Sequence, residues 1–181
     1  MRNATLALLL LGASAPALQA QAAATSSVAG ENPREVQMRM LEHQRQFLHS
    51  MADSMPERLY RDKATPAQRD FAQQVHHAAG AAAMISRQTM GGPALSLPDT
   101  GKALNTRAGL KSFIDASYDY AAGLLKGQTA ASRAETISLF GKSMPRWQVW
   151  DEIHTHTVWT AGQLVANFRK NGMAPPAFTF F

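Results

Sequence analysis

The sequence predicts an all-α protein, a four-helix bundle with a longer connection before the last helix. Apolar residues recur at helical spacing in four segments, helix start and stop signals flank these segments, and no convincing pair of strands interrupts them. Each amphipathic helix has one apolar stripe to bury, and packing the four stripes together buries all of them.

The first two helices are defined by proline and glycine signals. We expect the first to start after Asn32, with Pro33 in its first turn, and to end at Pro56. The second is predicted to start at Thr65-Pro66-Ala67-Gln68, which has the spacing of a capping box, and to stop at Gly91.

The third and fourth helices are separated by the longer connection. The third follows Thr106 and ends at Gly127, and the fourth runs from about Pro145 to Asn171. Residues 128–144 connect them, and a short extended piece is predicted within this connection at residues 136–140.

The N-terminal segment has the layout of a secretory signal peptide. Arg2 precedes a short apolar run at residues 6–11, Pro16 breaks that run, and Ala20-Gln21-Ala22 matches a small-residue cleavage site. The alternative is an uncleaved N-terminal anchor, but the run is shorter than the roughly 20 residues that span a bilayer. We therefore predict an exported protein, periplasmic or secreted, without a stable membrane anchor.

The domain organisation follows from that assignment. The signal peptide is predicted at residues 1–22, a flexible lead of small and polar residues at 23–31, and one helical domain at 32–181. The length is enough for one domain with a sizeable core, and nothing in the composition suggests a second.

Composition excludes several classes of function. Lys and Arg number 18 against 13 Asp and Glu, a formal net charge of +5, but the basic residues are scattered and form no patch with aromatic residues. We expect no nucleic-acid partner. The chain has no Cys, so any metal ion must be held by His, carboxylate or hydroxyl groups.

Adjacent histidines in the second predicted helix diverge by about 100° around its axis. His76 shares a face with polar residues such as Gln73 and is expected on the solvent side. His77 shares a face with Gly80 and Ala81 and is the inward candidate. A lone histidine on a helix is more often a surface residue than a ligand.

The last predicted helix contains the other candidate. His154 and His156 diverge by about 200°, so a regular helix cannot direct both to one ion. Glu152, His156, Thr160 and Gln163 share one face. Polar groups on an inward face need partners, which a metal ion or a mutual hydrogen-bond network would supply. The alternative is that this face is simply exposed to solvent. The spacing leads to the hypothesis of a metal site shared by His77 and His156.

Five segments follow one another in a recognisable order. They are Ser54-Met-Pro-Glu-Arg-Leu-Tyr60, Lys63-Ala-Thr-Pro-Ala-Gln-Arg-Asp-Phe71, Phe71-Ala-Gln-Gln-Val-His-His77, His156-Thr-Val-Trp-Thr-Ala-Gly-Gln-Leu-Val165 and Phe168-Arg-Lys-Asn-Gly-Met-Ala-Pro-Pro176. Together they span nearly the whole predicted domain, and they resemble the corresponding segments of the DinB-like (DinB/YfiT-type) superfamily of metalloenzymes.

This resemblance implies a four-helix bundle with a divalent ion, typically zinc or nickel, on three histidines. One ligand comes from the second helix, here His77, and two come from an H-x-x-x-H pair on the last. The first of that pair is His156, but the second position holds Thr160, which departs from the family pattern. Glu152, one turn before His156, is a hypothetical replacement ligand because carboxylates accompany histidines in open catalytic sites.

Two functions remain open. The first is a metal-dependent hydrolase or transferase, as in the resembled superfamily, with Glu152 as third ligand or general base. The second is a non-catalytic small-molecule-binding or interaction bundle whose metal site has decayed. Under it, Trp147, Trp150 and Trp159 belong to the core or a pocket wall. A homodimer is expected by analogy with other helix bundles. The sequence identifies no substrate.

Overall fold

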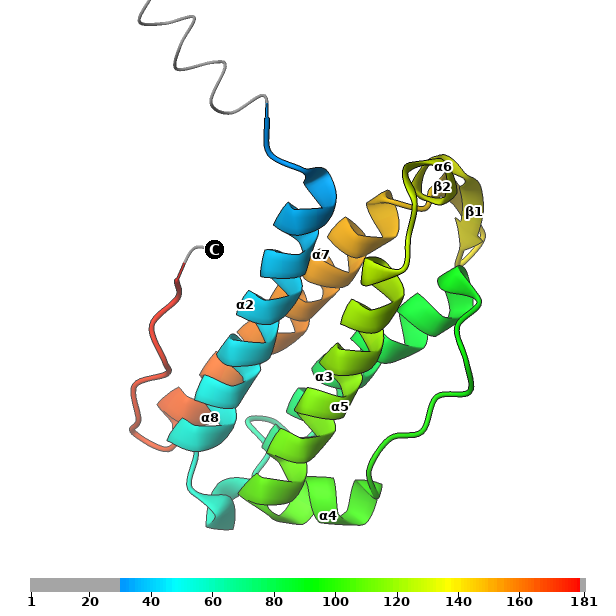
Figure 1. Cartoon of the computed structure of the whole chain (residues 1–181). Helices are drawn as coiled ribbons and strands as arrows, with labels where there is room; N and C mark the ends of the chain where they lie inside the picture. The colour runs from blue at the N-terminus through cyan, green and yellow to red at the C-terminus, as the bar shows by residue number, and fades with distance from the viewer. Residues whose placement is uncertain (1–29, 180–181) are drawn as a thin grey trace, which may run out of the picture. The chain divides into compact units, whose positions relative to one another are not determined.

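The computed structural model describes residues 30–179 (Figure 1). The predicted signal peptide and residues 23–29 of the predicted lead lie outside the described residues. The chain divides into two units, residues 1–33 and 34–181. In the first, Glu31 and Asn32 have no regular structure, and the first described helix starts at Pro33, as predicted.

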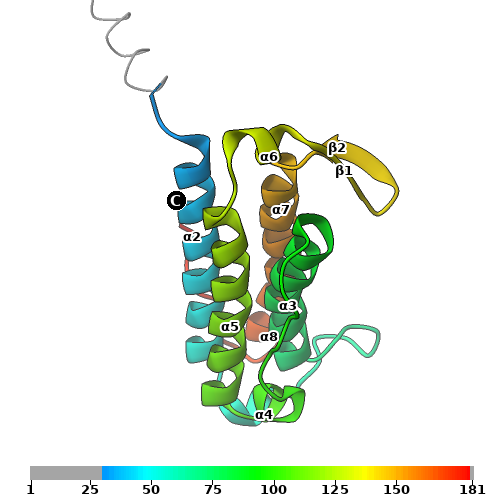
Figure 2. The same cartoon turned by 45° about the vertical axis from the view of Figure 1, so that its right-hand side comes forward.

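The second unit is mostly helical, which confirms the predicted all-α class. The elements of the described residues are α2 (Pro33–Ser54), the 3₁₀ turn η1 (Glu57–Leu59), α3 (Phe71–Met90), α4 (Thr100–Asn105), α5 (Arg107–Lys126), α6 (Ala130–Ala134), β1 (Thr136–Leu139), β2 (Lys142–Pro145), α7 (Gln148–Gly162) and α8 (Leu164–Lys170). Figures 1 and 2 show α2, α3, α5 and α7 side by side, with the β1–β2 hairpin at one end and α4 at the other. None of the helices within residues 30–179 combines the length and apolar character that crossing a membrane requires.

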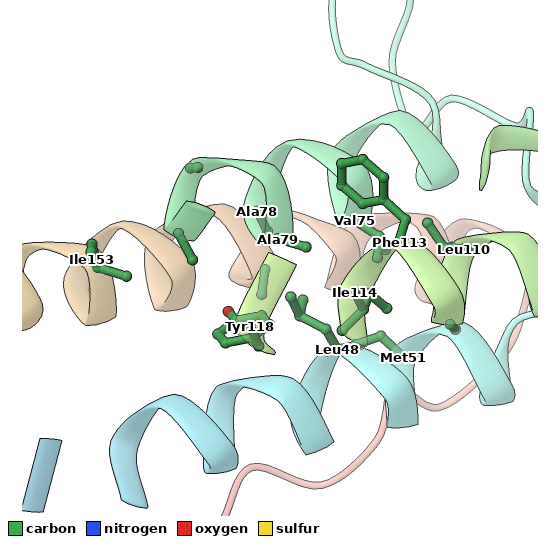
Figure 3. Close-up of a cluster of buried hydrophobic side chains, with 14 of the residues drawn as sticks. Leu48, Met51, Val75, Ala78, Ala79, Leu110, Phe113, Ile114, Tyr118 and Ile153 are labelled. Atoms are coloured by element: carbon green, nitrogen blue, oxygen red, sulfur yellow. The ribbon is translucent and has the colours of Figure 1, made fainter. Parts of the chain in front are cut away.

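The hydrophobic core lies where these four helices face one another (Figure 3). Leu48 of α2, Ala78 of α3, Ile114 and Tyr118 of α5, and Ile153 of α7 are all at most 1% exposed. Burying a large apolar side chain contributes about 1.5–3 kcal/mol, so this cluster favours packing of the four helices. Helix α3 packs against both α5 and α7 and is therefore central.

The predicted start of the second helix is wrong. Helix α3 begins at Phe71 rather than near Thr65, and Asp70 is its N-cap. The Asp70 carboxylate accepts from the backbone N–H of Gln73 at 2.8 Å, and the Asp70 N–H donates to Gln73 Oε1 at 3.1 Å. Both segments have capping-box spacing, but the Phe71 N–H bonds back to the Asp62 carbonyl, which folds the preceding residues into a loop.

The predicted absence of a strand pair is also wrong, although the predicted extended piece is confirmed as β1. Strand β1 pairs antiparallel with β2, with Leu139 opposite Lys142. Phe140 and Gly141 form the tight turn with φ angles of 49° and 81°. Two consecutive positive φ angles are typical of hairpin turns whose twist matches the strands.

The last predicted helix begins later than expected and is divided. Pro145 belongs to β2, and α7 starts at Gln148. Helix α7 ends at Gly162, and α8 continues from Leu164. Glycine lacks a side chain and lowers helix stability, which accounts for a break at this position.

Candidate metal centre

His77 of α3 and His156 of α7 lie against each other. Their ring centroids are 5.2 Å apart and the ring planes are inclined by 72°. Two imidazoles bound to one tetrahedral zinc, with Zn–N bonds of about 2.0–2.1 Å, would have ring centres about 5 Å apart. The structure therefore brings together the two histidines of the hypothesis at a separation that one ion could bridge.

Both imidazoles are half-buried, and this makes their neutral form more stable. Burial lowers the pKa of His77, and the nearby positive charges of Arg69, His156 and His76 lower it further. Burial and the charge of Arg69 lower the pKa of His156. Neutral imidazole is the form that binds metal ions, so both rings are in that form at neutral pH.

Thr160 stands at the position where the resembled superfamily has a third histidine. It is 2% exposed, and its hydroxyl oxygen lies 3.5 Å from Nε2 of His156. That distance is at the outer limit of a hydrogen bond. A threonine hydroxyl remains protonated at neutral pH and is a poor metal ligand. Its burial excludes the alternative in which Thr160 belongs to a solvent-exposed face.

Glu152 does not join the histidine pair. Its carboxylate accepts a hydrogen bond from Gln148 Nε2 at 3.1 Å, one turn earlier on α7. Within residues 30–179, no group of three His, Cys, Asp or Glu side chains is placed to hold a metal ion. The structure thus brings together His77, His156 and Thr160, and it leaves Glu152 outside this group.

Part of the polar face on α7 forms a hydrogen-bond network with α3. The side-chain amide of Gln74 donates to the Thr160 carbonyl at 3.0 Å and to Gln163 Oε1 at 3.1 Å. Gln74 is 5% exposed, so these bonds satisfy a buried amide. Gln163 therefore takes part in a hydrogen-bond network between helices, which is one of the alternatives predicted for this face.

His76 is not on the solvent side, so that prediction is wrong. Its ring stacks on Phe113 of α5 with centroids 3.8 Å apart and planes inclined by 24°. Burial lowers its pKa, and its Nε2 is buried without a hydrogen-bond partner among the described residues. Because α3 packs against two helices, the adjacent histidines contact α5 and α7 respectively, and both are half-buried.

Arg69 is a site residue that the sequence pattern did not reveal. It is exposed, in the loop before α3, and its charge acts on both His77 and His156. A positive charge at this position disfavours a second cation nearby. Arg69 lies one residue before Asp70, the N-cap of α3. The sequence prediction placed Arg69 inside the helix, because it started the helix near Thr65.

The tryptophans divide between core and surface. Trp150 is 2% exposed, and its indole N–H donates to Gln128 Oε1 at 3.0 Å. Trp147 and Trp159 are 43% and 75% exposed. The core part of the expectation is therefore confirmed for Trp150 and wrong for Trp147 and Trp159.

The donor set fits a divalent ion only in part. Two neutral imidazoles are close together, whereas the third position offers a hydroxyl and the positive charge of Arg69 acts on both rings. Nδ1 of His156 is buried without a hydrogen-bond partner among the described residues, although ligating histidines normally donate from their second nitrogen. A complete three-ligand site is therefore not formed by these residues.

Fold and site together define a mostly helical domain with a half-buried histidine pair between two of its helices. No protein-family model matches the chain, and no curated protein matches its sequence.

Proposed function

We propose that this chain is an exported DinB-like four-helix-bundle protein whose metal centre has decayed, and that it works as a non-catalytic small-molecule-binding protein. The side-by-side arrangement of α2, α3, α5 and α7 supports the bundle. The five sequence segments between Ser54 and Pro176, which occur in the same order as in the superfamily, support the resemblance. The pattern of residues 1–22 supports export.

The observation that carries the proposal is Thr160 beside His156. The side chain that approaches Nε2 of His156 from the next turn is a neutral hydroxyl at 3.5 Å. Structural and catalytic zinc sites use at least three protein ligands from His, Cys, Asp or Glu. With two imidazoles and the charge of Arg69 nearby, the ion is held weakly.

Metal analysis tests this proposal. The chain, purified without a His tag from cells grown with added zinc and nickel, is expected to carry much less than one ion per chain after dialysis. Substitution His77→Ala should leave that low content unchanged. One tightly held ion per chain in the wild type, lost in His77→Ala, would contradict the proposal.

The 5.2 Å separation of the ring centroids favours a second candidate, a metal-dependent hydrolase or transferase. In it, His77 and His156 hold the ion, which would polarise a substrate oxygen or activate a bound water. Glu152, which the structure leaves outside the pair, would have to turn from Gln148 toward the histidines to be the third ligand or the general base.

Zinc titration distinguishes the two candidates. The metal-dependent enzyme requires tight zinc binding that becomes weaker in Glu152→Ala. Glu42→Ala, which removes an exposed carboxylate on α2, is the control and should leave zinc binding unchanged.

A further inference from the structure

A hollow lies on another side of α7 from the histidine pair. It has a volume of about 360 Å³ and is lined by α2, α7, α8 and the C-terminal segment at residues 176–179. Figure 1 shows the chain after α8 turning back beside α2. His43 Nε2 and Thr179 Oγ1 are 2.9 Å apart, and this contact holds the C-terminal segment against α2.

The walls of the hollow are mainly apolar. Phe47 and Met51 come from α2, Val158 and Val165 from α7 and α8, and Phe178 from the C-terminal segment. Val158 is 43% exposed and Phe178 63% exposed. Apolar surface that remains in contact with water is stabilised when another apolar group covers it.

One side of the hollow carries two buried polar side chains whose contacts with Tyr118 are long, although Nε2 of Gln44 donates to the Met40 carbonyl at 3.0 Å. Gln44 and Thr157 line it and are each 1% exposed. The Tyr118 hydroxyl lies 3.4 Å from Gln44 Oε1 and 3.4 Å from Thr157 Oγ1. Ordinary O–H···O bonds are about 2.7–2.8 Å long, so Oε1 of Gln44 and the Thr157 hydroxyl retain capacity to bond to a ligand.

The lining also indicates the charge of the ligand. The described residues around the hollow include no Lys, Arg, Asp or Glu. The imidazoles of His43 and His154 line it as well. An ion placed there would lose hydration without an opposite charge to compensate.

We propose that this hollow binds one small neutral amphiphile, a molecule of the alkylphenol or aromatic alcohol class. Its apolar body lies against Phe47, Val158 and Phe178, and its hydroxyl bonds to Gln44 and Thr157. The volume is near the lower end of the roughly 300–1,000 Å³ of small-molecule pockets, which are apolar with a few placed polar groups. Ligand binding in the hollow is argued from its lining alone, and only the biological role of that binding rests on the proposed function.

Gly162 provides a sharp test. It lines the hollow, and a Cβ added to it would meet no atom within 4 Å. Gly123 of α5 likewise has open space where a Cβ would be added, and it does not line the hollow. A Cβ at position 162 therefore meets no clash, and Gly162→Leu is designed to extend from it into the hollow, with Gly123→Leu as its control.

The probe is N-phenyl-1-naphthylamine, whose fluorescence rises in apolar surroundings. We expect wild type and Gly123→Leu to bind one equivalent with equal affinity, and Gly162→Leu to bind at least tenfold more weakly. 4-Butylphenol should displace the probe at lower concentration than butylbenzene, which lacks the hydroxyl, or 4-butylbenzoate, which is charged. Phe178→Ser removes the opposite wall and should also weaken binding if Gly162→Leu fails to fold.

Three outcomes would overturn the inference. They are no probe binding to wild type, equal binding by the two leucine variants, or a wild-type dimer in sedimentation that Gly162→Leu dissociates. The last would make the hollow a self-association surface. Metal content is measured separately: a metal-loaded chain that binds the probe contradicts only the proposed function, and a metal-poor chain that does not bind it contradicts only this inference.

Discussion

The hydroxyl oxygen of Thr160 lies 3.5 Å from Nε2 of His156, one turn away on α7, and the ring of His156 faces that of His77 on α3. Position 160 thus lies beside one ring of the histidine pair. A single substitution at this position therefore tests whether the histidine pair can be completed to a metal site.

Thr160→His should create a three-histidine site. We expect zinc affinity to rise on the order of 100-fold, because a third neutral imidazole completes the ligand set. Competition with a chelating dye measures the affinity. Thr155→His, on an exposed position of the same helix, is the control and should not change it. Equal affinities in the two variants would show that the histidine pair is not arranged around a common point.

Stability should fall as the pH drops below about 6.5. Burial lowers the pKa of His76, His77, His154 and His156 in the folded state from the ordinary value of 6.5. The unfolded chain then binds more protons, so the free energy of unfolding is full above pH 6.5 and decreases as the pH falls from there through the folded pKa values.

Urea unfolding between pH 7.5 and 5 measures this dependence. Each titrating group can contribute at most about 1.4 kcal/mol per pH unit. His77→Gln combined with His156→Gln should reduce the slope. An unchanged slope in the double variant would mean that these two histidines do not change their proton affinity on folding.

His76→Phe should stabilise the protein by about 1 kcal/mol. The stacking on Phe113 is retained, and the buried Nε2 that has no hydrogen-bond partner among the described residues is removed. Thermal unfolding at pH 7.5 measures the effect. His76→Ala is the contrasting variant, because it loses the stacking and should destabilise. A destabilised His76→Phe would contradict this role for the contact.

Asp70→Ala should lower the free energy of unfolding by about 1–2 kcal/mol. The substitution removes the N-cap of α3 and its bond to the Gln73 N–H. Asp70 is also paired with Arg61 at 3.1 Å, and it is 2% exposed. Asp99→Ala removes the N-cap of the six-residue helix α4 and should have a smaller effect, since α4 is short and Asp99 is exposed. If Asp70→Ala and Asp99→Ala lowered the free energy of unfolding equally, the N-cap of α3 would not be more important for stability than that of α4.

Helix ends show where sequence reasoning reaches its limit. Pro33 marks the start of α2, and Gly91 and Gly127 follow the ends of α3 and α5, as predicted. Stop signals of this kind depend on the residue type itself, so local sequence suffices, although of these residues only Gly91 adopts a left-handed φ, of 66°. The start of α3 was missed because two capping patterns compete, and the contact between Phe71 N–H and the Asp62 carbonyl selects one.

The candidate site shows the same division. Helical periodicity was enough to select His77 over His76 as a partner for His156, since the two directions differ by about 100°. It could not show that His76 would stack on Phe113, because that requires α5 to lie beside α3. It also could not place the charge of Arg69 near both imidazoles.

The sequence by itself determined the helical class, the approximate positions of the long helices and the choice of His77 and His156, because periodicity and turn residues are local properties of the chain. Only the tertiary structure decided that Thr160 is buried beside His156 and that Glu152 stays apart. It also formed the hollow between α2, α7 and the C-terminal segment. These features depend on which helices are neighbours, and side chains distant in sequence meet only once the helices have packed.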